Sequence, residues 1–286
     1  MASRKQRTKS FHVRGKINAR RLGLTLLGIV AVLALIFAFR AYKAANDLAN
    51  GKPFDHLPAL RSDLQKGKVN LQKPIIDLSA FQPHTAINYD QLASQVSGVI
   101  VRVQHGTKQT PSSTINSDGS DTQFKYHITQ FQARGIPVAV YAYVDGNSIS
   151  AMKAQAKAFF KNASPYQPTF YWLDAETLSM KDINDGLVAY RDELISLGVP
   201  ASRIGIYSNV AFFVENGIET SNFATSWVAS YGLDNGSFSG KAATTFPFAL
   251  QQYTSKGNLE GYSGNLDLSR ASSQAAYAQI FLGKSS

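Results

Sequence analysis

Two carboxylates, Asp174 and Glu176, lie two residues apart at the end of the aromatic and apolar stretch FYWLDAET, residues 170–177. A buried strand normally excludes acids, because an unpaired charge inside a protein is costly to desolvate. Two acids at this spacing repel each other when both are ionised, so one of them should keep its proton above its usual pKa. The pair is therefore a candidate reaction centre. The alternative is a strand end that reaches water, with both acids in an ion pair or a helix cap.

Two further acids follow apolar runs elsewhere in the chain: Asp77 in PIIDLS and Asp267 in NLDLS. Side chains alternate between the two faces of a strand, which puts Asp174 and Glu176 on one side, with Cα atoms about 6.6 Å apart. In a parallel barrel the carboxyl ends of the strands share one face, where active sites are built. We expect all four acids to meet in one pocket at that face.

The elements that must position these acids are short apolar, β-branched runs that alternate at first with helical segments. Near-continuous hydrophobicity is typical of strands buried on both faces. The runs cover residues 74–79, 98–104, 136–144, 168–176, 203–209, 226–231, 247–253 and 265–269. Helices are expected at 89–96, 122–134, 148–162, 181–197 and 272–282. This order predicts an α/β barrel of eight strands that is regular at first and irregular at its end, where loops replace helices.

Clustered carboxylates suit the hydrolysis of a glycosidic bond. The leaving oxygen must be protonated, and the positive charge that builds up on the sugar needs an anion nearby. Aromatic rings offer faces on which sugar rings can stack, although each ring alone is more often part of a core. Those close to the acids are Phe81, Tyr141, Tyr143, Tyr171, Trp172, Tyr207, Trp227, Tyr231 and Tyr253.

The N-terminal part of the chain has a different composition. Eight of the 29 basic residues and none of the 19 acidic residues lie in residues 1–21, so 21 basic residues face 19 acids in the rest. Residues 22–39, LGLTLLGIVAVLALIFAF, carry no charge and as a helix would be about 27 Å long, close to the thickness of a bilayer core. The positive-inside rule then puts residues 1–21 in the cytoplasm. A cleaved signal peptide is the alternative, but its apolar region is typically shorter.

These patterns predict four segments and a location. They are a basic cytoplasmic tail (1–21), a single transmembrane helix (22–39), a polar stalk (40–73) and a catalytic barrel (74–286). We expect a single-pass protein of the cell membrane whose catalytic domain is extracellular. The globular part is nearly neutral, so no nucleic-acid partner is expected.

The residue types present exclude some chemistries. The chain has no cysteine, which rules out thiol catalysis and cysteine-ligated metals. Its five histidines show no close ligand spacing such as HExxH. We therefore expect neither a metal site nor a cofactor.

Seven segments in order resemble the motifs of the family 25 glycoside hydrolases, lysozymes that act as N-acetylmuramidases on peptidoglycan. The resemblance covers roughly residues 74–282. Its segments are PIIDLSAFQ, GVIVRVQHG, ARGIPVAVYAY, WLDAE, IGIYSN, SWVASY and LQQYTSKGNLEGYSGNLDLS. One match would mean little, but seven in register are specific.

The resemblance implies a fold, a reaction and a site. The fold is an irregular TIM-like (β/α)5(β)3 barrel, and the reaction is hydrolysis of the β-1,4 bond between N-acetylmuramic acid and N-acetylglucosamine. Glu176 matches the catalytic acid, Asp174 the carboxylate beside it, and Asp77 and Asp267 two further active-site acids. Whether Asp174 acts as a nucleophile or orients the substrate's 2-acetamido group for attack is left open. The side chains expected to bind the glycan strand are Tyr141, Tyr143, Tyr207, Trp227, Tyr231, Gln252 and Tyr253.

The sequence departs from the family pattern at two points. Gln251 stands where the family often has Trp before the Gln-Tyr pair, and His105 precedes Gly106 where an acid is usual. The insertion-like stretch TKQTPSSTINSDGSD follows at 107–121. All four acids are present, so we expect an active enzyme that remodels the cell wall. The alternatives are a barrel that binds peptidoglycan without cleaving it and a chitinase-like glycosidase.

Overall fold

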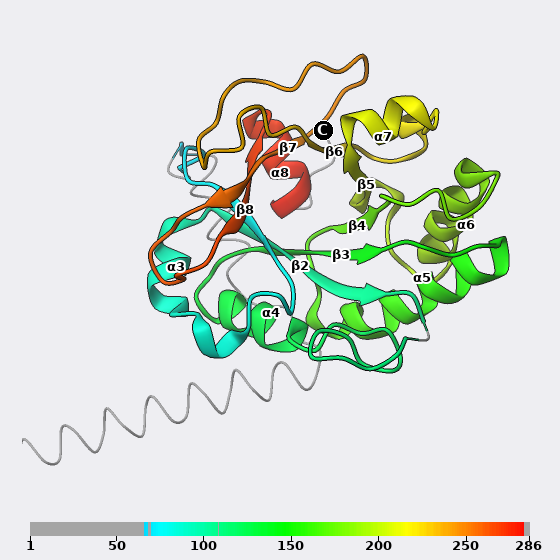
Figure 1. Cartoon of the computed structure of the whole chain (residues 1–286), viewed down its shortest axis with the longest axis horizontal. Helices are drawn as coiled ribbons and strands as arrows, with labels where there is room; N and C mark the ends of the chain where they lie inside the picture. Colours follow the sequence, from blue (N-terminus) through cyan, green and yellow to red (C-terminus); the bar gives the residue numbers. More distant parts are fainter. Residues whose placement is uncertain (1–65, 68–69, 108, 283–286) are drawn as a thin grey trace, which may run out of the picture. The chain divides into compact units, whose positions relative to one another are not determined.

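Eight strands form one closed barrel in the order of the sequence (Figure 1). The computed structural model describes residues 66–67, 70–107 and 109–282, all of which fall in the unit Leu48–Ser286. The strands are β1 (Ile75–Leu78), β2 (Gly98–His105), β3 (Val138–Tyr143), β4 (Tyr171–Asp174), β5 (Ile204–Asn209), β6 (Ser226–Ala229), β7 (Leu250–Gly257) and β8 (Leu266–Ala271). The predicted eight-stranded α/β barrel is confirmed.

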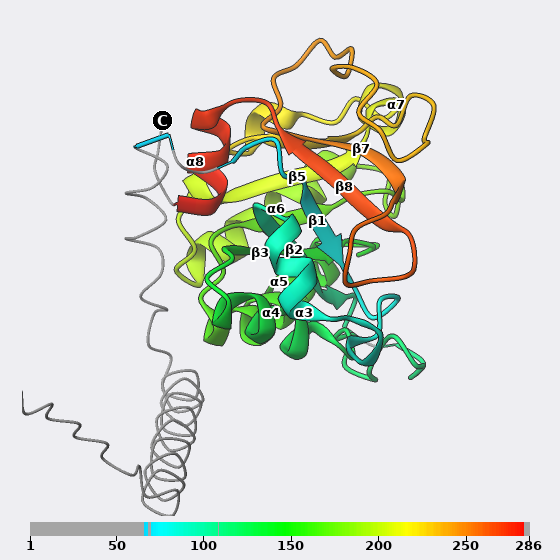
Figure 2. The ribbon, with the colours of Figure 1, turned by 90° about the vertical axis from the view of Figure 1, so that its left-hand side faces the viewer.

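The first seven strands run parallel, and β8 runs antiparallel to both of its neighbours, β7 and β1. An α-helix follows each of the first five strands, whereas loops follow β6 and β7 (Figures 1 and 2). The helices are α3 (Tyr89–Gln95), α4 (Phe124–Ala133), α5 (Ile149–Ala163), α6 (Ile183–Ser196), α7 (Val210–Glu215) and, after β8, α8 (Gln274–Leu282). Five β/α units are thus followed by three strands. Only α7 lies outside the predicted helices.

Side-chain caps fix where three of these helices begin. The side chains of Asn88, Ser148 and Asn209 accept hydrogen bonds from backbone N–H groups in the first turns of α3, α5 and α7, respectively. Each cap satisfies a donor that the helix itself leaves unpaired. The turns between strands and helices are therefore defined by local sequence, which fixes the strand ends at the mouth of the barrel.

The strands bury both faces, because side chains alternate between the barrel interior and the layer beneath the helices. In β1, Ile75 belongs to the interior cluster and Ile76 to the cluster shared with the helices. Trp172 and Trp227 fill the middle of the barrel, with ring centroids 5.8 Å apart. A Cβ on Gly205 would lie 2.3 Å from Cζ3 of Trp172, so glycine at this position makes room for the indole. Because these indole rings fill the interior, the polar side chains of the barrel lie above them, at its mouth.

The predicted transmembrane helix, residues 22–39, and the tail and most of the stalk around it lie outside the described residues. Within the part of the chain that the structure describes, no helix has the length and apolar character needed to span a bilayer.

Candidate active site

A pocket of about 310 Å³ opens at the end of the barrel where the parallel strands terminate. Asp77, Asp174, Glu176 and Asp267 all line it, so the structure brings the four predicted acids together. Its lining residues are Asp77, Ser79, Phe81, Gln82, Arg102, Tyr141, Tyr143, Asp174, Glu176, Tyr207, Trp227, Tyr231, Gln252 and Asp267. Residues that are far apart in the chain thus share one polar cavity.

Asp174 and Glu176 lie on the same side of the chain at the end of β4. Asp174 is the last residue of the strand and is 7% exposed, and its Oδ1 has no hydrogen-bond partner. Burial and then the charge of Glu176 raise the pKa of Asp174 well above its usual value, while Arg102 opposes the shift. Glu176 is exposed, yet the pocket walls still desolvate its carboxyl group and raise its pKa; the Tyr207 hydroxyl opposes this. The pair therefore holds a proton at a pH where free carboxyl groups are ionised.

Asp77 and Asp267 face each other across the antiparallel pair β1–β8, where they are direct partners. Burial and then the charge of Asp267 raise the pKa of Asp77 well above its usual value. Asp267 is less buried, and desolvation raises its pKa to about 6. The hydrogen bond between the two carboxyl groups raises the pKa of Asp77 and lowers that of Asp267. Asp77 is therefore the protonated member, which donates to an ionised Asp267.

The position of Asp267 has a different cause from the one expected. We predicted that it ends a strand and reaches the mouth as Asp77 does, but it is the second residue of β8. Because β8 runs antiparallel to its neighbours, its beginning lies at the same face as the ends of the other strands. The prediction of a shared pocket holds, while the reason given for Asp267 was wrong.

Gln252 connects one acid with two tyrosines. Its Nε2 donates to Oδ2 of Asp77 over 2.8 Å, and its Oε1 accepts from the hydroxyls of Tyr207 and Tyr231, each over 2.7 Å. The two hydroxyl donors determine which end of the amide faces Asp77. Gln252 thereby holds Asp77 in place and lowers the pKa of that carboxyl group against the effect of burial.

Arg102 is a pocket residue that we did not predict. It is 8% exposed, its Nε donates to Oδ2 of Asp121 over 2.9 Å, and its Nη2 has no partner. Asp121 also accepts from the backbone N–H groups of Ala80 and Gln123, so it connects β1 to the segment after β2. The sequence contained a signal, because Arg102 interrupts the apolar run GVIVRVQ at a position that alternation directs inward.

The predicted aromatic residues divide into two groups. Tyr141, Tyr143, Tyr207, Trp227 and Tyr231 line the pocket, whereas Tyr253 does not. Tyr253 lies where the register of β7 with β8 shifts, between Gln252 and Thr254, and its ring packs edge-on against Phe238 at 5.6 Å. Tyr253 therefore lies outside the pocket in which it was expected to bind substrate.

His105 supports Tyr143 from outside the pocket. The two rings lie 4.6 Å apart, and His105 Nε2 lies 3.4 Å from Oδ2 of Asp145. The Tyr143 hydroxyl is within 2.6 Å of the Thr177 hydroxyl, just beyond Glu176. The departure at His105 thus affects how one wall of the pocket is held and leaves the acids untouched.

The arrangement provides the groups that cleavage of an acetal linkage requires. The pair Asp174/Glu176 holds a proton, and Glu176 is its solvent-exposed member; Asp77 and Asp267 supply negative charge in the same pocket. Within the described residues, no group of three or more His, Cys, Asp or Glu side chains is arranged to hold a metal ion.

Comparison with known proteins places the chain among sugar-cleaving enzymes. The family model described as "Glycosyl hydrolases family 25" matches residues 76–262. The virulence factor GHIP, a glycosyl hydrolase 25 of Streptococcus pneumoniae, is 40% identical, with a TM-score of 0.73 over 79% of this chain and 99% of that chain.

Two further solved structures are similar in fold. The catalytic domain of endolysin ply40 from bacteriophage P40 of Listeria monocytogenes is 24% identical, with a TM-score of 0.62 over 72% of this chain and 96% of that chain. A bacterial lysozyme from Streptomyces coelicolor is 19% identical, with a TM-score of 0.57 over 74% of this chain and 98% of that chain. A comparison with curated proteins found no match.

Proposed function

We propose, from the premise that this chain belongs to glycosyl hydrolases family 25, that it cleaves the β-1,4 bond between N-acetylmuramic acid and N-acetylglucosamine in peptidoglycan. The chain is a glycoside hydrolase, as its family and its 40% identity to a glycosyl hydrolase 25 indicate. The observation that carries the finer proposal is the meeting of four acids in one pocket that aromatic rings also line. Similar structures described as lysozymes and endolysins support the same substrate.

Glu176 protonates the leaving oxygen in this proposal. It is the one acid of the four that is exposed, so a glycosidic oxygen can reach it. Because the pKa of its carboxyl group is raised, it stays protonated to a higher pH than a free glutamate. Its position also matches the family's catalytic acid in the motif WLDAE.

Asp174 acts beside Glu176, on the sugar that carries the developing positive charge. Its buried Oδ1 has no partner in the protein, so it is free to accept a hydrogen bond from substrate or to approach the reacting carbon. Asp77 and Asp267 contribute further charge and hydrogen bonds from the opposite side of the barrel. Tyr141, Tyr143, Tyr207 and Tyr231 provide the walls for the glycan strand, and Trp227, which fills the middle of the barrel, lies below them.

The catalytic test uses the full-length chain, solubilised in detergent and incubated with purified peptidoglycan. New reducing ends should appear, and Glu176→Gln should reduce their rate of release by about 10²–10⁴-fold, the usual contribution of a general acid. Glu215→Gln makes the same chemical change at an exposed position on α7 and should leave the rate unchanged. Binding without cleavage, or cleavage of chitin but not of peptidoglycan, would contradict the proposal.

The proposed location rests on the amino-acid pattern of residues 1–73. The uncharged segment 22–39 would anchor the enzyme, and the stalk at 40–73 would hold the catalytic barrel, from residue 74 onward, outside the cell. An enzyme tethered in this way would remodel the wall of its own cell. Extraction of membranes with alkaline carbonate should leave the full-length chain in the pellet, and release of the chain into the supernatant would contradict anchoring.

A further inference from the structure

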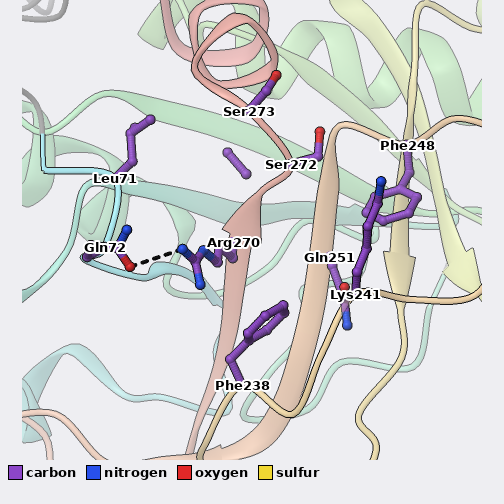
Figure 3. Close-up of a pocket in the computed structure, with 10 residues that line it drawn as sticks. Leu71, Gln72, Phe238, Lys241, Phe248, Gln251, Arg270, Ser272 and Ser273 are labelled. Carbon is purple, nitrogen blue, oxygen red and sulfur yellow. Dashed lines mark hydrogen bonds between the residues drawn. The ribbon is translucent and has the colours of Figure 1, made fainter. Parts of the chain in front are cut away.

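A second pocket, of about 370 Å³, lies outside the barrel, next to β7 and β8 (Figure 3). Gln251 and Arg270 are direct partners in these two strands, and both line the pocket, whereas Gln252 and Asp267 point into the active site. No helix follows β6 or β7, so this side of the sheet is covered by the loop that connects those strands. The pocket and the active site therefore lie on opposite faces of the same two strands.

The side chain of Gln251 holds the loop that forms one wall of the pocket. Its Nε2 donates to the carbonyls of Ser230 and Gly240, each over 3.0 Å, and its Oε1 accepts from the N–H of Ala242 over 2.8 Å. One buried amide thus fixes the loop that carries Phe238, Lys241 and Phe248. The departure from the family pattern at Gln251 concerns this outer pocket and not the site of cleavage.

Two cations line the pocket, and no acid does. The guanidinium of Arg270 lies 5.1 Å from the ring centre of Phe238, and Lys241 Nζ lies 5.5 Å from that of Phe248. Arg270 also donates to Oε1 of Gln72 over 3.0 Å. Neither cation forms an ion pair with any acid in the described part of the chain. Both positive charges are therefore available to a ligand.

Polar groups at the start of α8 complete the lining. Ser272 and Ser273 line the pocket just before this helix, whose N-terminal end carries partial positive charge (Figure 3). Ser273 Oγ accepts from the N–H of Ala276 over 3.1 Å, and its own hydroxyl proton is free to donate outward.

We propose that this outer pocket binds a phosphate group carried by a soluble anionic polymer. Two cations, two hydroxyls and a helix N-terminus match a group with several anionic oxygens better than a single carboxylate, which one arginine could satisfy. A recess of this volume admits one group and the unit attached to it. A flat bilayer surface would meet only its rim. The pocket would hold the enzyme on such a polymer while the opposite face of the strands works on the glycan.

The test is calorimetric titration of the full-length chain with inorganic phosphate, with a short glycerol phosphate oligomer and with sodium acetate. Both phosphate probes should bind and acetate should not. Lys241→Gln and Arg270→Gln should each weaken binding of the oligomer by about tenfold. Arg270→Lys keeps the charge and should restore most of the affinity. Lys153→Gln, an equal change of charge on the exposed face of α5, should alter it less than about twofold.

Lys241 is exposed, so its replacement tests the proposal even if a change at Arg270 disturbs the fold. Three results would overturn the proposal: no binding of either phosphate probe, equal affinity for acetate, or affinity that survives both neutralising substitutions. Binding that requires vesicles of phosphatidylglycerol and is absent for the soluble oligomer would overturn it in favour of a membrane surface. Cleavage of peptidoglycan is measured separately, so failure of this proposal leaves the proposed reaction untouched.

Discussion

Replacing Asp267 by asparagine should stabilise the protein at alkaline pH while it removes a group from the active site. Asp267 is partly buried next to Asp77, and desolvation raises the pKa of its carboxyl group from 3.8 to about 6. A carboxyl group with a raised folded-state pKa destabilises the folded state when it is ionised. The penalty is absent below pH 3.8, grows between 3.8 and about 6, and is complete above that. Asparagine retains an oxygen that can accept from a protonated Asp77, so the contact survives.

The size of the effect follows from the two pKa values. The difference between 3.8 and about 6 corresponds to about 3 kcal/mol at 25 °C. Solvent reaches part of the side chain and screens its charge, so the expected gain at pH 8 is about 1–2 kcal/mol. At pH 4 the gain should be below about 1 kcal/mol. For a domain of this size, about 1–2 kcal/mol raises Tm by about 2–8 °C.

Urea unfolding at pH 4 and pH 8 measures the effect directly. Asp145→Asn serves as the control of opposite sign, because hydrogen bonds from His105 and Gln155 lower the pKa of Asp145. Its charge stabilises the folded state at pH values above its usual pKa, so this variant should lose up to about 1 kcal/mol at pH 8. The reasoning would be refuted if Asp267→Asn were no more stable than the parent protein at pH 8, or if both variants shifted stability in the same direction.

Three other substitutions test separate parts of the structure. Gly205→Ala should lower the free energy of unfolding by at least about 1–3 kcal/mol, because the added Cβ would lie 2.3 Å from Trp172; an unchanged urea midpoint would contradict that packing. Arg102→Met should cost about 3–5 kcal/mol, since it leaves the buried charge of Asp121 with two backbone N–H donors but no cation, and a loss below about 1 kcal/mol would show that the ion pair contributes little. Tyr253→Phe should leave kcat/KM within about twofold, and a tenfold loss would place its hydroxyl in the catalytic pathway.

The sequence predicted the barrel well because its strands are buried on both faces and therefore form continuous apolar runs. Each of the eight runs overlaps one strand, and five of the six α-helices match predicted segments. Helix α7 was missed because six residues are too few to establish a helical period. The direction of β8 was also missed, since a single apolar run carries no information about which way its strand runs.

The candidate site was predicted in its acids and less well in their surroundings. Alternation put Asp174 and Glu176 on one side, the positions of Asp77 and Asp267 in apolar runs of a parallel barrel added these two acids, and the motif resemblance agreed with all four. Arg102 was not among the predicted site residues because the run GVIVRVQ was treated only as an apolar strand, although its guanidinium is buried and paired with Asp121. These positions depend on tertiary contacts that no local pattern reports.

The same limit applied to two neighbouring residues of β7. Tyr253 was assigned to the pocket together with Gln252, but it lies at a register shift of β7, which the sequence does not reveal, and its ring packs against Phe238. Gln251 was noted only as a departure from the family pattern, and its side chain holds the loop around the outer pocket.

The most direct test of the proposed reaction is to digest purified peptidoglycan with the full-length enzyme in ¹⁸O-labelled water and to identify the new reducing ends by mass spectrometry. Hydrolysis at the proposed bond places an oxygen atom from water on the anomeric carbon of the new reducing end. The account predicts a label on N-acetylmuramic acid, lost in Glu176→Gln. A label on N-acetylglucosamine, or labelled products that persist in that variant, would contradict it.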